Sequence, residues 1–227
     1  MIYTEFEKII STSRMNRYLN ACNGDTKKAM TLYRLNLRLS HELFTVISCF
    51  EIALRNRINN HCYTALGNDW LRASITQGGI FNNGASRLTS RTISDAITKL
   101  NRSYNHNKLV AELGFGFWRY IFAPHQYNAT GKTLLRIFPK KPISSYFQQY
   151  NQSFVFNQLA KINILRNRIA HHEPICFRNN HPVINTIYIR QYYCLIKELF
   201  QWMDIDESSF LYGLDHVEQI CDKIDHL

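Results

Sequence analysis

Apolar residues recur at intervals of three and four along most of the chain, and this spacing places them on one face of an α-helix. The clearest run covers residues 27–65. Its apolar positions are Leu32, Leu35, Leu39, Leu43, Val46, Ile47, Phe50, Leu54 and Ile58. Asp25 and Thr26 precede the run as candidate N-cap residues, and Gly67 follows it as a candidate stop. The pattern therefore predicts one long amphipathic helix.

Shorter helical runs fill most of the remaining sequence. We predict further helices near residues 3–21, 92–104, 108–122, 153–172 and 186–203, and a last one from a cap at Asp206 to about Ile224. The chain has only nine glycines and five prolines, strand-like alternation is weak, and no linker separates the runs. The sequence therefore predicts an all-α fold in a single domain that covers residues 1–227.

The sequence shows neither a membrane span nor an export signal. No apolar run reaches the length of about eighteen residues that a spanning helix needs, and the first residues include Glu5 and Glu7 in place of a long apolar block. The six cysteines are scattered without paired short spacings, which is typical of reduced thiols. We expect a cytoplasmic protein that does not associate with membranes.

The charge balance points to a polyanionic partner. The chain carries 27 lysines and arginines against 17 aspartates and glutamates, a formal net charge of +10. The excess is spread along the sequence and does not sit in a tail. A globular surface this basic is typical of nucleic-acid binding, although soluble proteins without such a partner can share it. Charge alone therefore favours a nucleic-acid ligand.

The segment 165–172, which reads LRNRIAHH, holds the candidate chemistry. It closes the helical run at 153–172, and Pro174 stops that helix. A histidine can accept or donate a proton near neutral pH, and a guanidinium stabilises negative charge on phosphate oxygens. These groups suit metal-free cleavage of RNA by its own 2′-hydroxyl, a reaction that DNA escapes because it lacks this hydroxyl.

Metal-dependent chemistry fits the sequence poorly. Metal-dependent nucleases hold hard cations with converging carboxylates, but acidic residues are sparse here and only Glu173 lies near the histidines. His171, His172 and His181 lack a clear fourth ligand and a recognised zinc spacing. We therefore expect no metal and no cofactor. A purely structural alternative remains, in which the arginine-rich helix end only caps the last carbonyl groups and complements the helix dipole.

The angular positions of Arg166 and His171 around the helix indicate that one copy of this segment does not form a complete active site. At about 100° per residue, Arg166 and His171 lie roughly 140° apart around the helix axis. Asn167 and His171 share a face at a spacing of four, so Asn167 can orient the imidazole. Arg166 falls near the apolar stripe and needs an anion or carboxylate, because an unpaired buried charge is costly. We therefore expect the missing groups to come from a second subunit of a homodimer or from residues 54–58.

Residues 54–58 repeat the first part of the segment. Both stretches read LRNRI, both lie near the end of a long helical run, and both are followed by histidine. Arg55 thus corresponds to Arg166. A match of five residues between two helices of similar composition is also compatible with coincidence, so the role of this repeat stays open.

Six stretches together resemble a known family. They are SRMNRYLNACNGDTKKAMTLYRLN (13–36), FEIALRNRI (50–58), NDWL (68–71), LVAELGFGFWRYIF (109–122), LRNRIAHHEPI (165–175) and LFQWMD (199–204). Their order is similar to that in the Abi-like (AbiD/AbiF) proteins of bacterial abortive infection, within the HEPN superfamily of ribonucleases. The spacing from Arg166 to His171 also resembles the HEPN signature of arginine, a polar residue, three further residues and histidine.

The resemblance implies a HEPN-like helical bundle with additional helices, usually dimeric, with a composite active site at the interface. It implies metal-independent cleavage of RNA that leaves a 2′,3′-cyclic phosphate, and a role in antiphage defence or as a toxin that an RNA or protein antidote restrains. Carried over by position, Arg166 and His171 are the catalytic pair and Asn167 supports them. The accessory candidates are His172, which is the alternative catalytic histidine, Arg168, Glu51, which we expect to pair with a motif arginine, and Arg55.

Two other classes of function compete with the ribonuclease. The same basic surface would suit a non-catalytic RNA-binding or dimerisation module of a defence system. A purely structural interaction protein would neither bind nor cleave RNA. Cleavage of mixed RNAs by the wild type and by a His171→Ala variant separates the three.

Overall fold

The computed structural model describes residues 1–178 and 181–227, and in this part the regular structure is helical apart from one isolated bridge between Phe177 and Ile184. The helices are α1 (Tyr3–Ile10), α2 (Thr12–Ala21), α3 (Thr26–Leu66), α4 (Trp70–Ala73), η1 (Gly84–Ser86), α5 (Arg87–Leu100), η2 (Asn101–Ser103), α6 (His106–Glu112), α7 (Phe115–Tyr120), α8 (Pro124–Ala129), η3 (Leu134–Ile137), α9 (Gln152–Ala170), α10 (Ile187–Trp202), α11 (Glu207–Phe210) and α12 (Val217–Asp225). The predicted all-α fold class is confirmed.

The chain forms two compact units that interleave along the sequence. Unit 1 comprises residues 1–48, 164–197 and 207–227, and unit 2 comprises residues 49–163 and 198–206. Helices α3, α9 and α10 each contribute residues to both units. The single domain over residues 1–227 stays a prediction.

The long helix α3 agrees with the predicted run at 27–65. The Asp25 carboxylate accepts hydrogen bonds from the backbone N–H groups of Lys27 at 2.9 Å and Lys28 at 3.0 Å, which caps the first turn. After the last turn, Gly67 adopts a φ of +99°, a conformation that glycine tolerates at a helix end. All nine apolar positions of the predicted stripe are buried. Local signals therefore set both the extent and the inward face of this helix.

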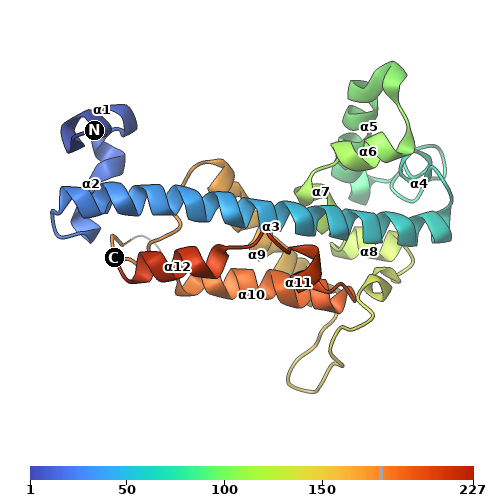
Figure 1. The fold of residues 1–227 in the computed structure, drawn as a ribbon. Helices are drawn as coiled ribbons and strands as arrows, with labels where there is room; N and C mark the ends of the chain where they lie inside the picture. The colour runs from blue at the N-terminus through green and yellow to red at the C-terminus, as the bar shows by residue number, and fades with distance from the viewer. Residues whose placement is uncertain (179–180) are drawn as a thin grey trace. The chain divides into compact units, whose positions relative to one another are not determined.

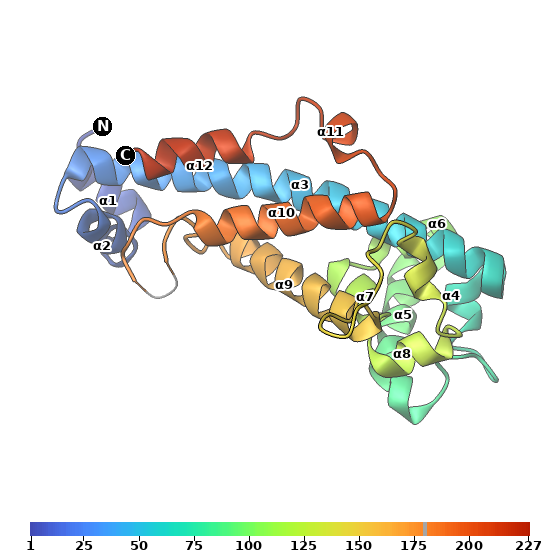
Figure 2. The same cartoon turned by 90° about the horizontal axis from the view of Figure 1, so that it is seen from below.

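Unit 1 is built around the N-terminal part of α3. In both views α12 runs alongside this part of α3, and the two chain termini lie at the same end of it (Figures 1 and 2). Aromatic side chains fill the core there: the Tyr18 ring centroid lies 5.3 Å from that of Tyr33 and 5.0 Å from that of Phe177. These contacts bury α2 and the segment that follows α9 against the same helix.

Charge pairing ties α12 to α10 within unit 1. The Arg190 guanidinium donates to the carboxylates of Asp222 at 2.8 Å and Asp225 at 3.0 Å, and it also pairs with Glu218. The Thr186 hydroxyl donates to Asp225 at 2.6 Å. One arginine thus pairs with three acidic side chains of α12.

Unit 2 contains the C-terminal part of α3 and helices α4 to α8 (Figure 1). Its core includes the fully buried indoles of Trp70 and Trp118. Trp70 donates its Nε1–H to Asn59 of α3 at 2.9 Å, and His106 of α6 contacts the same amide oxygen at 2.8 Å. Asn59 therefore joins α3, α4 and α6 through one oxygen.

Four predicted helices are wrong in their extent, and the one near 92–104 instead begins at Arg87 and ends at Leu100. The run at 3–21 is divided into α1 and α2 at Ser11, whose φ of +93° breaks the helix and whose hydroxyl then faces the Arg14 N–H at 3.4 Å. The run at 108–122 is divided into α6 and α7, because Leu113 and Gly114 are extended. The last run is divided into α11 and α12, with Gly213 at a φ of +73° between them.

Two further expectations concern the cysteines and the membrane. The six cysteines, all of them in the described ranges, are free thiols; four are buried, Cys49 is half-buried and Cys194 is exposed. Within residues 1–178 and 181–227, none of the helices combines the length and apolar character that crossing a membrane requires.

Candidate active site

The motif helix α9 ends within the motif itself. Its last residue is Ala170, and the backbone then closes with hydrogen bonds from His172 N–H to Ile169 O at 2.9 Å and from Glu173 N–H to Arg168 O at 2.9 Å. His172 has a φ of +54°, the left-handed conformation that commonly follows a helix. Both histidines therefore lie just beyond the helix.

Arginines satisfy carbonyl groups at this helix end. The Arg14 guanidinium of α2 donates to the His172 carbonyl at 3.0 Å. Arg168 pairs with the Glu173 carboxylate at 3.1 Å and donates to the Pro174 carbonyl at 3.0 Å. The Arg168 guanidinium is thus occupied by contacts to residues just beyond the helix, neither of which is a carbonyl of α9, and the capping alternative stays a prediction.

Arg166 has a different environment, a groove between α3 and α9 within unit 1, with a volume of about 420 Å³. The residues that line this α3–α9 groove are Leu37, Ser40, His41, Phe44, Arg166, Ile169, Ala170 and His172. Arg166 is half-buried, and its Nε is buried without a hydrogen-bond partner in the part of the chain that the structure describes. The described lining includes no carboxylate, and four of its eight residues are apolar.

The structure brings some of the predicted site residues together and leaves others apart. Arg166 and His172 line the same groove, and His41 of α3 joins them. His171 and Asn167 are exposed and do not belong to the described lining. The hydrogen bond between these two residues runs from His171 N–H to Asn167 O at 3.0 Å, through the backbone. His41 carries no motif signal in the sequence, which is why sequence reasoning missed it.

The repeated segment at 54–58 and the motif each contain an arginine whose Nε is buried. Arg55 is half-buried in unit 2, and its Nε, like that of Arg166, is buried without a hydrogen-bond partner among the described residues. Leu54 and Ile58 are buried, as are their counterparts in α9. Glu51 is half-buried on α3, also in unit 2. Its pairing with a motif arginine stays a prediction.

One side chain anchors the segment that follows the motif. The buried Asn36 of α3 accepts hydrogen bonds from the backbone N–H groups of Ile175 at 2.8 Å and Cys176 at 3.1 Å. Phe177, the next residue, is buried and lies 4.8 Å from the Arg17 guanidinium. Asn36 sits among leucines on the buried face of α3, and this polar interruption was the signal that could have revealed its role.

Tyr188 of α10 connects this segment to Arg168. Its hydroxyl donates to the Ile175 carbonyl at 2.6 Å, and the Arg168 guanidinium lies 5.5 Å from the ring centroid. Burial raises the pKa of Tyr188 to about 12, an effect that the nearby Arg168 charge partly opposes. The phenol therefore stays protonated and keeps donating its hydrogen bond.

The protein is basic and all-helical in its described part, and Arg166, His41 and His172 line its α3–α9 groove. No group of three or more histidine, cysteine or acidic side chains in the described ranges is placed to hold a metal ion. The sequence matches the Abi-like protein family over residues 3–176, more than half of its length, and the chain belongs to this family. Neither curated proteins nor solved structures gave a match. Membership of the Abi-like family implies a role in abortive infection, a defence against phage.

Proposed function

We propose that this protein is a metal-independent endoribonuclease of antiphage defence, with its active site in the α3–α9 groove. The supporting observation is the half-buried guanidinium of Arg166, whose buried Nε lacks a partner among the described residues. A buried donor of a charged group that lacks a partner is costly, and an anion that accepts its hydrogen bond removes that cost. A phosphodiester presents two charged oxygens that a guanidinium can bind together.

The reaction needs only groups that the motif contains. The 2′-hydroxyl oxygen of RNA attacks the adjacent phosphorus, the bond from phosphorus to the 5′-oxygen breaks, and a 2′,3′-cyclic phosphate and a 5′-hydroxyl result. A neutral histidine takes the 2′ proton, and an imidazolium gives a proton to the leaving oxygen. Arg166 stabilises the charge that builds up on the phosphate oxygens. In this scheme His171 carries the proton and Asn167 supports it.

A second copy of the chain completes the site in this proposal. His171 is exposed and lies outside the described lining of its own groove, so it is available to the groove of a partner subunit. Leu37 and Phe44, at the same groove, are each 41% exposed although both are large and apolar. A homodimer that covers these side chains would gain hydrophobic burial and would bring two motifs together. The RNA or protein antidote belongs to the same proposal, as a ligand that keeps the groove closed to substrate.

The test is cleavage of mixed cellular RNA by the purified full chain in EDTA, with analysis of the product ends. We expect cyclic phosphate ends from the wild type, and loss of cleavage in Arg166→Ala and in His171→Ala. His125→Ala is a matched control, because His125 is an exposed histidine of unit 2. Undiminished cleavage by both motif variants would refute the assignment. Loss in His172→Ala with full activity in His171→Ala would exchange the roles of the two histidines.

Mixed subunits test the shared site. Each of the Arg166→Ala and His171→Ala proteins alone should be inactive. A mixed dimer still contains one intact Arg166 and one intact His171 on different subunits, so mixing should restore cleavage. A mixture that stays inactive although the subunits exchange would argue against a site shared in this way.

A further inference from the structure

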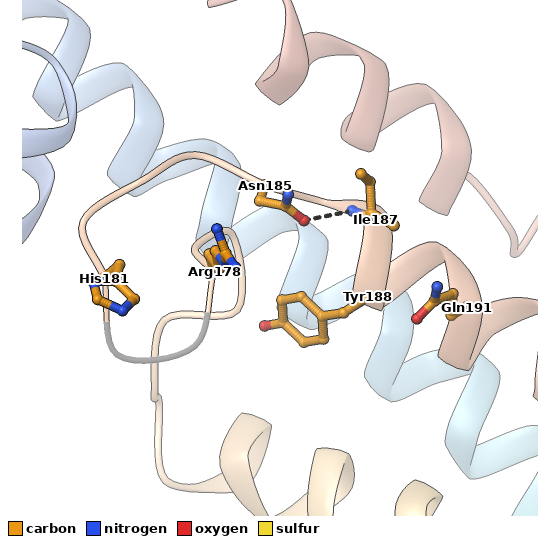
Figure 3. A pocket seen from close by; sticks show the side chains of 6 residues that line it. All are labelled: Arg178, His181, Asn185, Ile187, Tyr188 and Gln191. Atoms are coloured by element: carbon orange, nitrogen blue, oxygen red, sulfur yellow. Dashed lines mark hydrogen bonds between the residues drawn. The ribbon is translucent and has the colours of Figure 1, made fainter.

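A second hollow in unit 1 lies where the loop after the motif meets the start of α10 (Figure 3). This α10 pocket has a volume of about 400 Å³, and its lining residues are Arg178, His181, Asn185, Ile187, Tyr188 and Gln191. The match to the Abi-like family ends at residue 176. All lining residues of the α10 pocket lie beyond the matched residues.

Backbone hydrogen bonds hold the walls of the pocket in place. The Arg178 N–H donates to the Val183 carbonyl at 2.9 Å, and the Asn185 N–H donates to the Cys176 carbonyl at 2.9 Å. The Asn185 side-chain oxygen then accepts from the Ile187 N–H at 3.0 Å, which begins α10 (Figure 3). Because Cys176 is itself bonded to Asn36 of α3, the pocket is anchored to the core of unit 1.

The chemistry of the described lining combines three kinds of group. Arg178 supplies a permanent positive charge, and no carboxylate is among the described lining residues. Asn185 and Gln191 supply side-chain amides, which can donate and accept hydrogen bonds together and so match the edge of a base. Tyr188 supplies an aromatic ring, on which a base can stack. A nucleotide has a phosphate, a base edge and a base face for these three groups.

Tyr188 also connects this pocket to the motif helix. Its ring lies against the guanidinium of Arg168, two residues after Arg166 on α9, and its hydroxyl is fixed by the Ile175 carbonyl. The ring is thus held before any ligand binds, and little side-chain freedom remains to be lost on binding.

We propose that the α10 pocket binds one unpaired nucleotide of the RNA substrate and gives the enzyme a base preference. This inference rests on the proposed ribonuclease function, because it assigns a substrate subsite beside the same motif. In the subsite Arg178 binds the phosphate, Tyr188 stacks with the base, and Gln191 with Asn185 contacts the base edge. Such contacts read only a base that is not paired, so the substrate is single-stranded.

The experiment measures RNA binding separately from cleavage. The full chain carries His171→Ala, so that the RNA stays intact, and fluorescence anisotropy gives the Kd for short labelled homopolymers of adenylate, cytidylate and uridylate over a range of salt. Gln191→Ala should change the ratios among the three Kd values by about fivefold or more. Arg178→Ala should weaken all three similarly and reduce the slope of log Kd against log salt by about one. Arg102→Ala, an exposed arginine of unit 2, controls for lost charge.

The two proposals can fail separately. Unchanged Kd ratios in Gln191→Ala overturn the subsite, as does an Arg178→Ala protein that binds like Arg102→Ala. The subsite is also overturned if the His171→Ala protein without further substitution binds none of the RNAs. If the wild type cleaves RNA but Gln191→Ala leaves the Kd ratios unchanged, only the proposed subsite is wrong. If the Kd ratios depend on Gln191 but wild type does not cleave these or mixed RNAs, the subsite stands and the ribonuclease assignment fails.

Discussion

Replacing Asn36 with alanine tests whether one side chain holds the segment after the motif helix. The Asn36 side-chain oxygen accepts from the N–H groups of Ile175 and Cys176, and the residue is 2% exposed. A buried donor left without a partner costs about 1–3 kcal/mol, so two donors should lower the free energy of unfolding by about 2–6 kcal/mol. The higher helix propensity of alanine returns about 0.5 kcal/mol. We expect a net loss of about 1.5–5.5 kcal/mol.

Urea unfolding followed by far-UV circular dichroism measures this loss. Asn60→Ala is the matched control, because Asn60 is exposed on the same helix and the substitution gains helix propensity without removing a buried acceptor. The same change in residue type should therefore leave the Asn60 variant nearly as stable as the wild type. If Asn36→Ala unfolds at the same urea concentration as Asn60→Ala, the anchor carries no stability and the reasoning is wrong.

Three other predictions concern charge and thiol chemistry. Burial and, to a smaller extent, the Arg136 charge lower the pKa of His61 below 6.5. Folding therefore favours the neutral imidazole. The stability that His61 contributes is present above pH 6.5 and is lost as the pH falls. Urea unfolding at several pH values should show a weaker loss of stability in acid for His61→Gln. Arg190→Ala should cost about 1 kcal/mol in thermal unfolding, because its carboxylate partners are partly exposed, and added salt should reduce the difference from wild type. Cys194 should react first with a thiol reagent, whereas Cys62, whose burial raises its pKa to about 12, should react only on unfolding.

The long helices followed from the sequence because their apolar stripes continue for many turns. In α3 the stripe, the Asp25 cap and the glycine stop all agreed, and the structure has the helix within one residue of the predicted run at each end. The break at Ser11 was missed because the apolar spacing continues across it. Nothing in the local pattern shows that a single left-handed residue will redirect the chain.

The candidate site was predicted in part. The position of Arg166 beside the apolar stripe indicated partial burial, and the structure has it half-buried in a groove. The histidines could not be placed by helical phase, because α9 ends at Ala170 and an angle of about 100° per residue has no meaning beyond that point. The left-handed turn at His172 instead brings its side chain into the groove.

The α10 pocket could not be predicted at all. Its residues come from a loop and from the first turns of a helix, at irregular spacings that match no motif. They meet because Asn36 and the bridge from Phe177 to Ile184 fix the path of the loop. Such sites depend on long-range contacts, which a pattern of residues along one element does not contain.

The interleaving of the two units sets the order in which a growing chain can mature on the ribosome. Residues 1–48 of unit 1 emerge first, but their partners at 164–197 and 207–227 follow only after the whole of 49–163 has been made. Contacts between segments so far apart form late. In a nascent chain, Leu37 and Phe44 are therefore exposed to solvent before α9 has been synthesised and can form a groove with them. The protein gains its α3–α9 groove only after most of its length has been translated.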